Sequence, residues 1–228
     1  PSGAREIRQA AYEFDKMRKR ITIHLNQRSE MLSGISHDLR TPLTRMKLQL
    51  AMITDTKLSK KLSLNVDEME KMLNEYLHFS STEANDKTET FNFSELMEEI
   101  ILKYENSNIS LSSKPRIYFD GRKNLITRCI NNLLDNSLKY ANKIEINLEK
   151  ENTNLLISIS DDGPGVPETE YKNIIKPFYK IDKSRSETKS SVGLGLAISS
   201  GIIKSHGGDI VFNKSDLGGL KVKIFLPV

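Results

Sequence analysis

What this chain of 228 residues lacks already excludes several classes of protein. Cys129 is the only cysteine, so neither an internal disulfide framework nor a cysteine-based zinc finger can form. The 12 glycines and 7 prolines are too few for a collagenous or low-complexity chain. No apolar run approaches the roughly 20 residues that a membrane-spanning helix needs.

The chain also lacks a strong charge of either sign. Its 34 Lys and Arg against 30 Asp and Glu leave a formal net charge of +4, spread along the sequence. Nucleic-acid binding normally requires a clustered basic face, so we expect no nucleic-acid partner. Hydrophobic residues make up 37% and charged residues 28%, as in ordinary folded chains, and the length suits one large domain or two modest ones.

The sequence changes character near residue 85. Before it the apolar spacing is helical, and after it short β-branched runs alternate with helical patterns. The polar stretch at 80–88 reads as a linker. We therefore expect an N-terminal helix at 1–27, a helical hairpin at 28–82, a linker at 83–90 and an α+β domain at 91–228.

Two apolar seams with a mean step close to 3.5 residues predict the hairpin. The first consists of Leu32, Ile35, Leu39, Leu43, Met46, Leu50 and Ile53, and the second of Leu62, Val66, Met69, Leu73 and Tyr76. A single hairpin cannot cover both seams. The main expectation is that two hairpins form a dimeric four-helix bundle, and the alternative is that the hairpin packs on the rest of its own chain.

The second part predicts alternating strands and helices. Strands are expected at 91–93, 144–148, 155–160, 209–213 and 220–226, and as a hairpin at 109–111 and 117–119. Helices are expected at 95–104 with Ser94 as cap, from Gly121 to about Tyr140, near 170–176 and at 193–205, with a polar loop at 180–192.

Three polar patterns can carry chemistry. With Ile35 in the seam, His37 and Thr41 face solvent one turn apart, and Asp38 can hold the imidazole in one tautomer. Asn132 and Asn136 share a helix face, and their amide oxygens suit a hard cation shared with phosphates. Two glycine-rich segments, 161–165 after a strand and 192–197 opening a helix, allow a close ligand approach and anion binding.

Taken together and in this order, these motifs resemble the sensor histidine kinases of two-component systems, of the EnvZ-like kind, over roughly residues 28–228. His37 and its neighbours resemble the H box, Asn132–Tyr140 the N box, and Lys176–Tyr179 the F box. Asp162, Gly163 and Gly165 resemble the G1 box, and Gly193, Leu194, Gly195 and Leu196 the G2 box. Residues 4–17 resemble the last helix of a HAMP linker.

The resemblance implies an α+β multidomain chain, in which a dimeric helical bundle precedes an α/β sandwich of the histidine kinase, gyrase and Hsp90 type. ATP and Mg²⁺ would be its cofactors. Asp162 would accept a hydrogen bond from the adenine amino group, and Asn136 would hold the metal with support from Asn132. Lys139 would contact phosphate and Tyr140 the base or ribose, and Phe178 would lie in the same nucleotide site.

For the reaction, the resemblance implies attack by His37 on the γ-phosphate, with Asp38 as orienting group. Gly193 and Gly195 would give backbone amides to phosphate oxygens. The phosphoryl group would pass to a response regulator, most simply of the OmpR family, and Thr41 would serve its dephosphorylation. The chain would be the cytoplasmic portion of an inner-membrane sensor, joined to the membrane only through segments upstream.

Two other functions stay open at this point. One is a gyrase- or Hsp90-type ATPase, although such enzymes use a glutamate in the N-box helix and residues 126–140 contain none. The other is a catalytically degenerate dimeric scaffold, which the intact nucleotide motifs disfavour.

Overall fold

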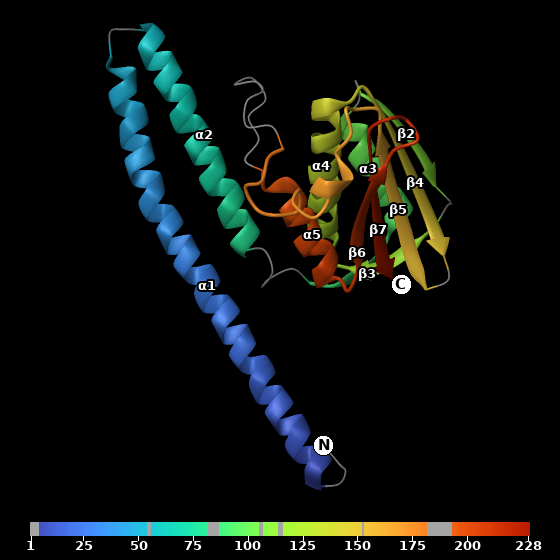
Figure 1. The fold of residues 1–228 in the computed structure, drawn as a ribbon. Helices are drawn as coiled ribbons and strands as arrows, with labels where there is room; N and C mark the ends of the chain where they lie inside the picture. Colours follow the sequence, from blue (N-terminus) through green and yellow to red (C-terminus); the bar gives the residue numbers. More distant parts are fainter. Residues whose placement is uncertain are drawn as a thin grey trace. The chain divides into compact units, whose positions relative to one another are not determined.

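A computed structural model describes residues 5–53, 56–81, 87–104, 107–113, 116–151, 153–181 and 193–228. The chain divides into two compact units, Pro1–Asn85 (unit 1) and Asp86–Val228 (unit 2). Figure 1 labels the α-helices and the strands of both except β1. In these described ranges, no helix is both long and apolar enough to cross a membrane.

Unit 1 is the expected helical hairpin, formed by α1 (Arg5–Ala51) and α2 (Thr56–Ser81). α1 is one continuous helix of 47 residues, and it runs without a break through residue 28, where the N-terminal helix was expected to meet the hairpin. Lys47 joins the two helices through ion pairs with Asp67, at 2.7 Å, and Glu70. The hydrogen bonds that Lys47 donates to these carboxylates, to Asp67 first and then to Glu70, raise the pKa of Lys47.

The hairpin buries only part of its two seams. Leu43 of α1 and Val66 of α2 are each 6% exposed. Other seam residues stay between 37% and 51% exposed, namely Ile35, Leu39, Met46, Ile53, Leu62 and Met69. One hairpin thus leaves an apolar face without cover from unit 1 itself.

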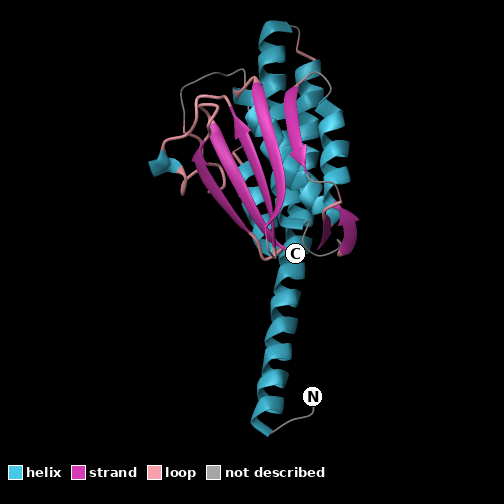
Figure 2. Cartoon of the chain, turned by 90° about the vertical axis from the view of Figure 1, so that its right-hand side faces the viewer, coloured by secondary structure: helices cyan, strands magenta, loops and turns pink. Residues whose placement is uncertain are grey.

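Unit 2 is built on a β-sheet (Figure 2). This sheet has five strands in the order β2-β4-β5-β7-β6. Its strands are β2 (Asn108–Ser113), β4 (Lys143–Glu151), β5 (Asn154–Asp161), β6 (Asp209–Lys214) and β7 (Leu220–Pro227). β2 runs parallel to β4, and the other neighbours are antiparallel. A separate antiparallel ribbon joins β1 (Glu89–Asn92) and β3 (Tyr118–Gly121).

Three helices cover one face of this sheet: α3 (Phe93–Ile101), α4 (Lys123–Tyr140) and α5 (Gly195–Ser205), with 3₁₀ turns at Leu102–Tyr104 and Glu168–Glu170 (Figure 1). Alternate residues of β4 and β5 point toward the helices and are almost fully buried: Ile144, Ile146, Leu148, Leu155, Ile157 and Ile159. On α4, Ile130, Leu133 and Leu134 are equally buried. The expected α/β sandwich is confirmed.

The hairpin expected at 109–111 and 117–119 is wrong. β2 joins the main sheet beside β4, whereas β3 pairs with β1. The aromatic rings give a physical reason for this pairing. Pairing with β1 places the ring centre of Phe119 5.9 Å from that of Phe91 and 6.0 Å from that of Phe93. Phe119 is thereby 2% exposed.

Three smaller expectations also need correction. Asn92 rather than Ser94 caps α3, because the Asn92 side chain accepts from the Ser94 N–H at 3.1 Å. Residues 170–176 form a 3₁₀ turn and further turns rather than a regular helix, since Pro177 disfavours helical backbone before it. α5 begins at Gly195, because Gly193 has a φ of +79°. Of the polar loop expected at 180–192, residues 182–192 lie outside the described part.

Candidate functional site

α4 and α5 lie against each other and bring the asparagine face to the second glycine segment. Cys129 and Ser199 exchange contacts between the helices: the Ser199 hydroxyl donates to the Cys129 carbonyl at 3.3 Å, and the Cys129 thiol donates to the Ser199 carbonyl at 3.9 Å. Burial raises the pKa of Cys129 to about 12, so this thiol is a core group. One turn further on, a Cβ placed on Gly195 would lie 3.9 Å from the Asn132 Cβ.

At this point the structure leaves a polar group without a partner. The Nδ2 atom of Asn132 is buried and has no hydrogen-bond partner among the described residues. Asn136 lies four residues later on α4, partly buried on the same face. An unsatisfied buried amide costs about 1–3 kcal/mol, so a polar ligand that bonded this nitrogen would be favoured here.

The start of α5 suits an anion. No side chain in the described part caps this helix, so its first backbone N–H groups stay available. These groups carry the positive end of the helix dipole. With Gly195 beside Asn132, a phosphate could meet the helix amides and the asparagine together.

Asp161, which ends β5, is the buried carboxylate of the first glycine segment. It is 5% exposed, and its Oδ1 accepts the N–H groups of Gly163 and Leu220, each at 3.0 Å. Its Oδ2 accepts the Ser137 hydroxyl of α4 at 3.2 Å. A carboxylate oxygen can accept two bonds, so Oδ2 retains capacity for a further donor.

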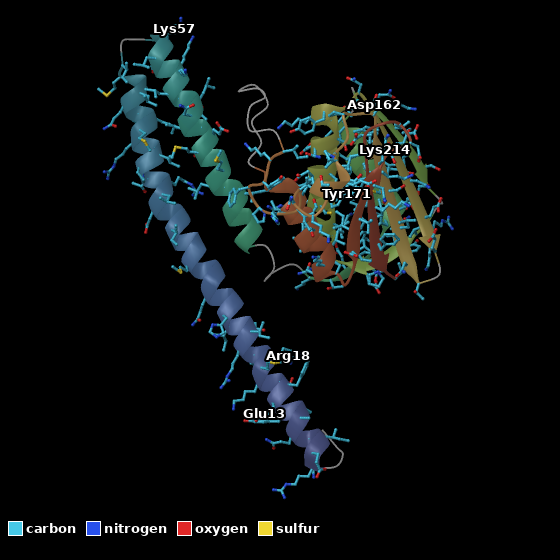
Figure 3. The ribbon with its side chains drawn as sticks, viewed as in Figure 1. Glu13, Arg18, Lys57, Asp162, Tyr171 and Lys214 are labelled. Carbon is cyan, nitrogen blue, oxygen red and sulfur yellow. The ribbon has the colours of Figure 1, made fainter. Side chains whose placement is uncertain are left out.

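Asp162, the residue predicted to read the base, lies in a different environment. Its side chain is exposed at the end of β5 (Figure 3), where Oδ1 accepts the N–H groups of Asn142 at 2.8 Å and Lys143 at 2.9 Å. These bonds, that of Lys143 first, lower the pKa of Asp162. Asp162 thus secures the start of β4.

Sequence reasoning missed Asp161, although two signals could have found it. The inward-facing alternation of Leu155, Ile157 and Ile159 continues to residue 161. Asp161 also stands two residues before Gly163 and four before Gly165, the regular spacing of an Asp-x-Gly-x-Gly motif. Asp162 directly precedes Gly163 and does not have this spacing.

The first glycine segment packs on the end of α4. A Cβ on Gly163 would lie 3.2 Å from the Tyr140 carbonyl oxygen, and Gly165, with a φ of +72°, faces the Gly219 carbonyl. Tyr140 itself is 52% exposed, and the Lys139 ammonium lies 5.1 Å from the centre of its ring. The glycine loop, a cation and an exposed aromatic ring therefore gather at one end of α4.

The predicted F-box and G2 segments also meet. The Phe178 N–H donates to the Gly193 carbonyl at 3.0 Å, and Phe178 has a φ of +64°. Phe178 is 56% exposed. Beyond Gly193, Leu194 is fully buried and anchors the segment, while Leu196 is partly buried.

The predicted phospho-acceptor residues belong to unit 1. His37 lies within α1, and its side chain is outside the described part. Asp38 and Thr41 follow on the same helix with exposed side chains. Pro42 also lies inside α1, and because it has no N–H it cannot bond the Asp38 carbonyl.

Two protein families match the chain in the order of its units. Residues 27–85 match the family described as His Kinase A (phospho-acceptor) domain. Residues 121–228 match the family described as histidine kinase-, DNA gyrase B-, and HSP90-like ATPase.

Known relatives extend over the whole chain. It is 33% identical over 227 residues to sensor histidine kinase GtrS of Pseudomonas aeruginosa, covering 99% of this chain and 47% of that protein. It is 28% identical over 241 residues to sensor histidine kinase CpxA of Escherichia coli, covering 100% of this chain and 53% of that protein. The chain thus spans about half the length of these curated relatives.

A solved structure supports the fold. The mycobacterial sensor histidine kinase MprB superposes with a TM-score of 0.55 and 21% identity, covering 62% of this chain and 97% of that one. At this identity the likeness concerns the fold alone.

Proposed function

Since the chain belongs to the sensor histidine kinases, with a phospho-acceptor domain followed by an ATPase-like domain, we propose that it is an ATP-dependent histidine kinase core. His37 takes the γ-phosphoryl group of ATP and passes it to an aspartate of a response regulator, which we take to be of the OmpR family. The observation that carries the proposal is the unpartnered buried amide of Asn132, which lies beside the uncapped start of α5.

We also propose which residues contact the nucleotide. We assign Asp161 the role that the resemblance gave to Asp162, because the free capacity of its buried Oδ2 suits the adenine amino group. Lys139 contacts phosphate, and Tyr140 packs near the base or ribose. The backbone amides of Gly193 and Gly195 take phosphate oxygens.

The residues present fit a Mg²⁺ ion shared with phosphates. Within the described ranges, no three His, Cys, Asp or Glu side chains gather as a metal site. The protein ligand would be the Asn136 side-chain oxygen, with Asn132 in support, and phosphate oxygens and waters would complete the shell. When bound, the ion neutralises charge that develops on the phosphates.

Phosphoryl transfer at His37 balances without a further reagent. A neutral imidazole nitrogen forms a bond to the γ-phosphorus, and the bond from that phosphorus to the bridging oxygen breaks, so ADP leaves with the electron pair. Asp38 orients the ring and accepts its remaining proton. Thr41 lies one turn later on the helix. It holds a water in line with the aspartyl phosphate of a docked response regulator and so serves the dephosphorylation of that regulator.

The exposed seam of unit 1 supports a homodimer. Residues such as Leu39 and Met69 are 45% and 51% exposed in the single hairpin, and a second hairpin would bury them in a four-helix bundle. We propose residues 28–82 as the dimerising phosphotransfer domain, 91–228 as the catalytic domain and 1–27 as a HAMP-like helix. Such a core would belong to the cytoplasmic side of an inner-membrane sensor.

Incubation with γ-labelled ATP tests the kinase assignment. We expect acid-labile, alkali-stable label on the chain, as phosphohistidine requires, and complete loss of label in His37→Gln. His24→Gln is the matched control, since His24 lies exposed on the same helix, and it should label normally. ATP hydrolysis without label would favour the gyrase-type alternative, and neither activity would favour the scaffold.

A further inference from the structure

Side-chain hydrogen bonds connect residues along the segment 170–179, which ends with the predicted F box. The Tyr179 hydroxyl donates to Glu170 Oε2, and the Asn173 amide donates to the same oxygen at 3.0 Å. The Lys176 ammonium in turn donates to the Asn173 side-chain oxygen at 2.7 Å. The bond from Tyr179 and then that from Asn173 lower the pKa of Glu170. Tyr179 is thus held at its outer end by the beginning of the same segment.

The backbone of Phe178 and Tyr179 packs closely against Gly193. A Cβ on Gly193 would come within 2.9 Å of the Tyr179 carbonyl oxygen and 3.1 Å of the Phe178 carbonyl carbon. The Phe178 N–H also donates to the Gly193 carbonyl. Phe178 and Gly193 both have positive φ, at +64° and +79°. A bulky residue keeps such a conformation only where its surroundings enforce it.

These contacts link a tyrosine hydroxyl to the start of α5. Gly193 stands two residues before Gly195, where the helix begins beside Asn132. We expect a shift of the Phe178–Tyr179 backbone to move Gly193, because the Phe178 N–H bonds the Gly193 carbonyl and the two backbones leave no room for a Cβ at Gly193. Tyr179 is partly buried, and the route that the structure offers from its hydroxyl to the start of α5 is this backbone contact.

We infer that Tyr179 and Glu170 act as a positioning pair that sets the phosphate-binding amides at the start of α5. The inference rests on the proposed function, because it assumes that these amides take phosphate oxygens. The pair acts through the protein: Glu170 fixes the ring of Tyr179, and the Tyr179 backbone fixes Gly193. It therefore governs affinity for the phosphate chain and leaves recognition of the base unchanged.

Dissociation constants for ATP, ADP and AMP, measured by calorimetry on the full chain with Mg²⁺, test the pair. Tyr179→Phe removes one oxygen atom and keeps the ring. We expect ATP to bind about tenfold more weakly, which corresponds to about 1.4 kcal/mol, while AMP binding stays within twofold. Glu170→Gln keeps an acceptor oxygen for the Tyr179 hydroxyl. This variant should therefore retain most of the ATP affinity that the Glu170→Ala variant loses.

Tyr171→Phe is the matched control. Tyr171 lies in the same segment (Figure 3), and its buried hydroxyl has no hydrogen-bond partner among the described residues. Its removal breaks no such bond and should leave all three dissociation constants unchanged. The double variant Tyr179→Phe with Glu170→Ala should lose no more ATP affinity than Glu170→Ala alone, since that variant already removes the bond of Tyr179 together with that of Asn173.

The outcomes separate the possible failures. Unchanged ATP affinity in Tyr179→Phe would overturn the positioning pair, and so would equal weakening of ATP and AMP, which is the mark of a general loss of structure. If the unaltered chain bound none of the three nucleotides, the proposed function would fall, and the positioning pair with it.

Discussion

The two units bury their apolar side chains to very different degrees. In unit 2, residues such as Ile144, Leu148 and Ile157 are fully buried between the sheet and its helices. In the described part of unit 1, only Leu43 and Val66 are buried hydrophobic residues, and large side chains of the same seams remain more than a third exposed. Unit 2 has a complete core of its own, whereas unit 1 needs a second surface to complete its core.

The difference matches the tasks proposed for the units. A nucleotide site needs groups fixed to within fractions of an ångström, which a closed core provides for Asn132 and Asp161. A phospho-acceptor helix must instead present its histidine to more than one protein. Completing its core with a second copy leaves the outer helix faces, which carry Asp38 and Thr41, open to partners.

The largest expected effect separates the two cores directly. Ile144→Ala should lower the free energy of unfolding of unit 2 by about 3 kcal/mol, because it opens a cavity in a closed core. We expect the melting temperature to fall by about 10 °C, independently of protein concentration. Scanning calorimetry at two concentrations provides the measurement.

Leu39→Ala is the corresponding change in unit 1. Leu39 is 45% exposed in the single hairpin, so its loss should weaken the dimer rather than the chain fold. We expect the dimer dissociation constant to rise about tenfold, seen by analytical ultracentrifugation. A concentration-independent loss of stability in Leu39→Ala, with no change in dimerisation, would contradict the contrast between the units.

The next prediction concerns Thr41 of unit 1, which should affect the dephosphorylation of the regulator and not the reaction with ATP in unit 2. In Thr41→Ala we expect regulator dephosphorylation to slow about tenfold, equal to about 1.4 kcal/mol of barrier, because the water loses its positioning group. Labelling of His37 should stay nearly intact. Paired assays of labelling and dephosphorylation decide: a parallel fall of both would assign Thr41 to helix stability alone.

Much of this architecture could be predicted from sequence because local periodicity determines it. The alternation of Ile144, Ile146 and Leu148 specified a strand with one buried face, and the heptad-like steps specified the hairpin. The pairing of β2 and β3 could not be predicted in the same way. Both strands are short, and their partners lie far along the chain, so aromatic packing around Phe119 decided the choice.

The candidate site shows the same limit. Sequence order brought the asparagines and glycines into one proposal, and the structure places Asn132 beside Gly195 and Gly163 against Tyr140. The choice between Asp161 and Asp162, however, depends on which carboxylate points inward. The hydrogen bond of Tyr179 to Glu170 was also beyond prediction, because it arises where a regular helix was expected and turns formed instead.

The smallest expected effect distinguishes the two aspartates by pH. Backbone N–H bonds from Lys143 and Asn142 lower the pKa of Asp162 below its ordinary 3.8. A group with a lowered folded-state pKa stabilises the fold above its unfolded pKa, and this contribution is lost as pH falls through the folded value. Asp162→Asn should therefore be slightly less stable than the parent near neutral pH, with the gap closing only below pH 3.8. Urea unfolding midpoints between pH 7 and pH 3 measure this stability difference.

ATP affinity should not change in Asp162→Asn, whereas Asp161→Asn, which alters the buried carboxylate, should reduce the preference for adenine over guanine nucleotides. Loss of adenine preference in Asp162→Asn alone would reverse the assignment of the two residues.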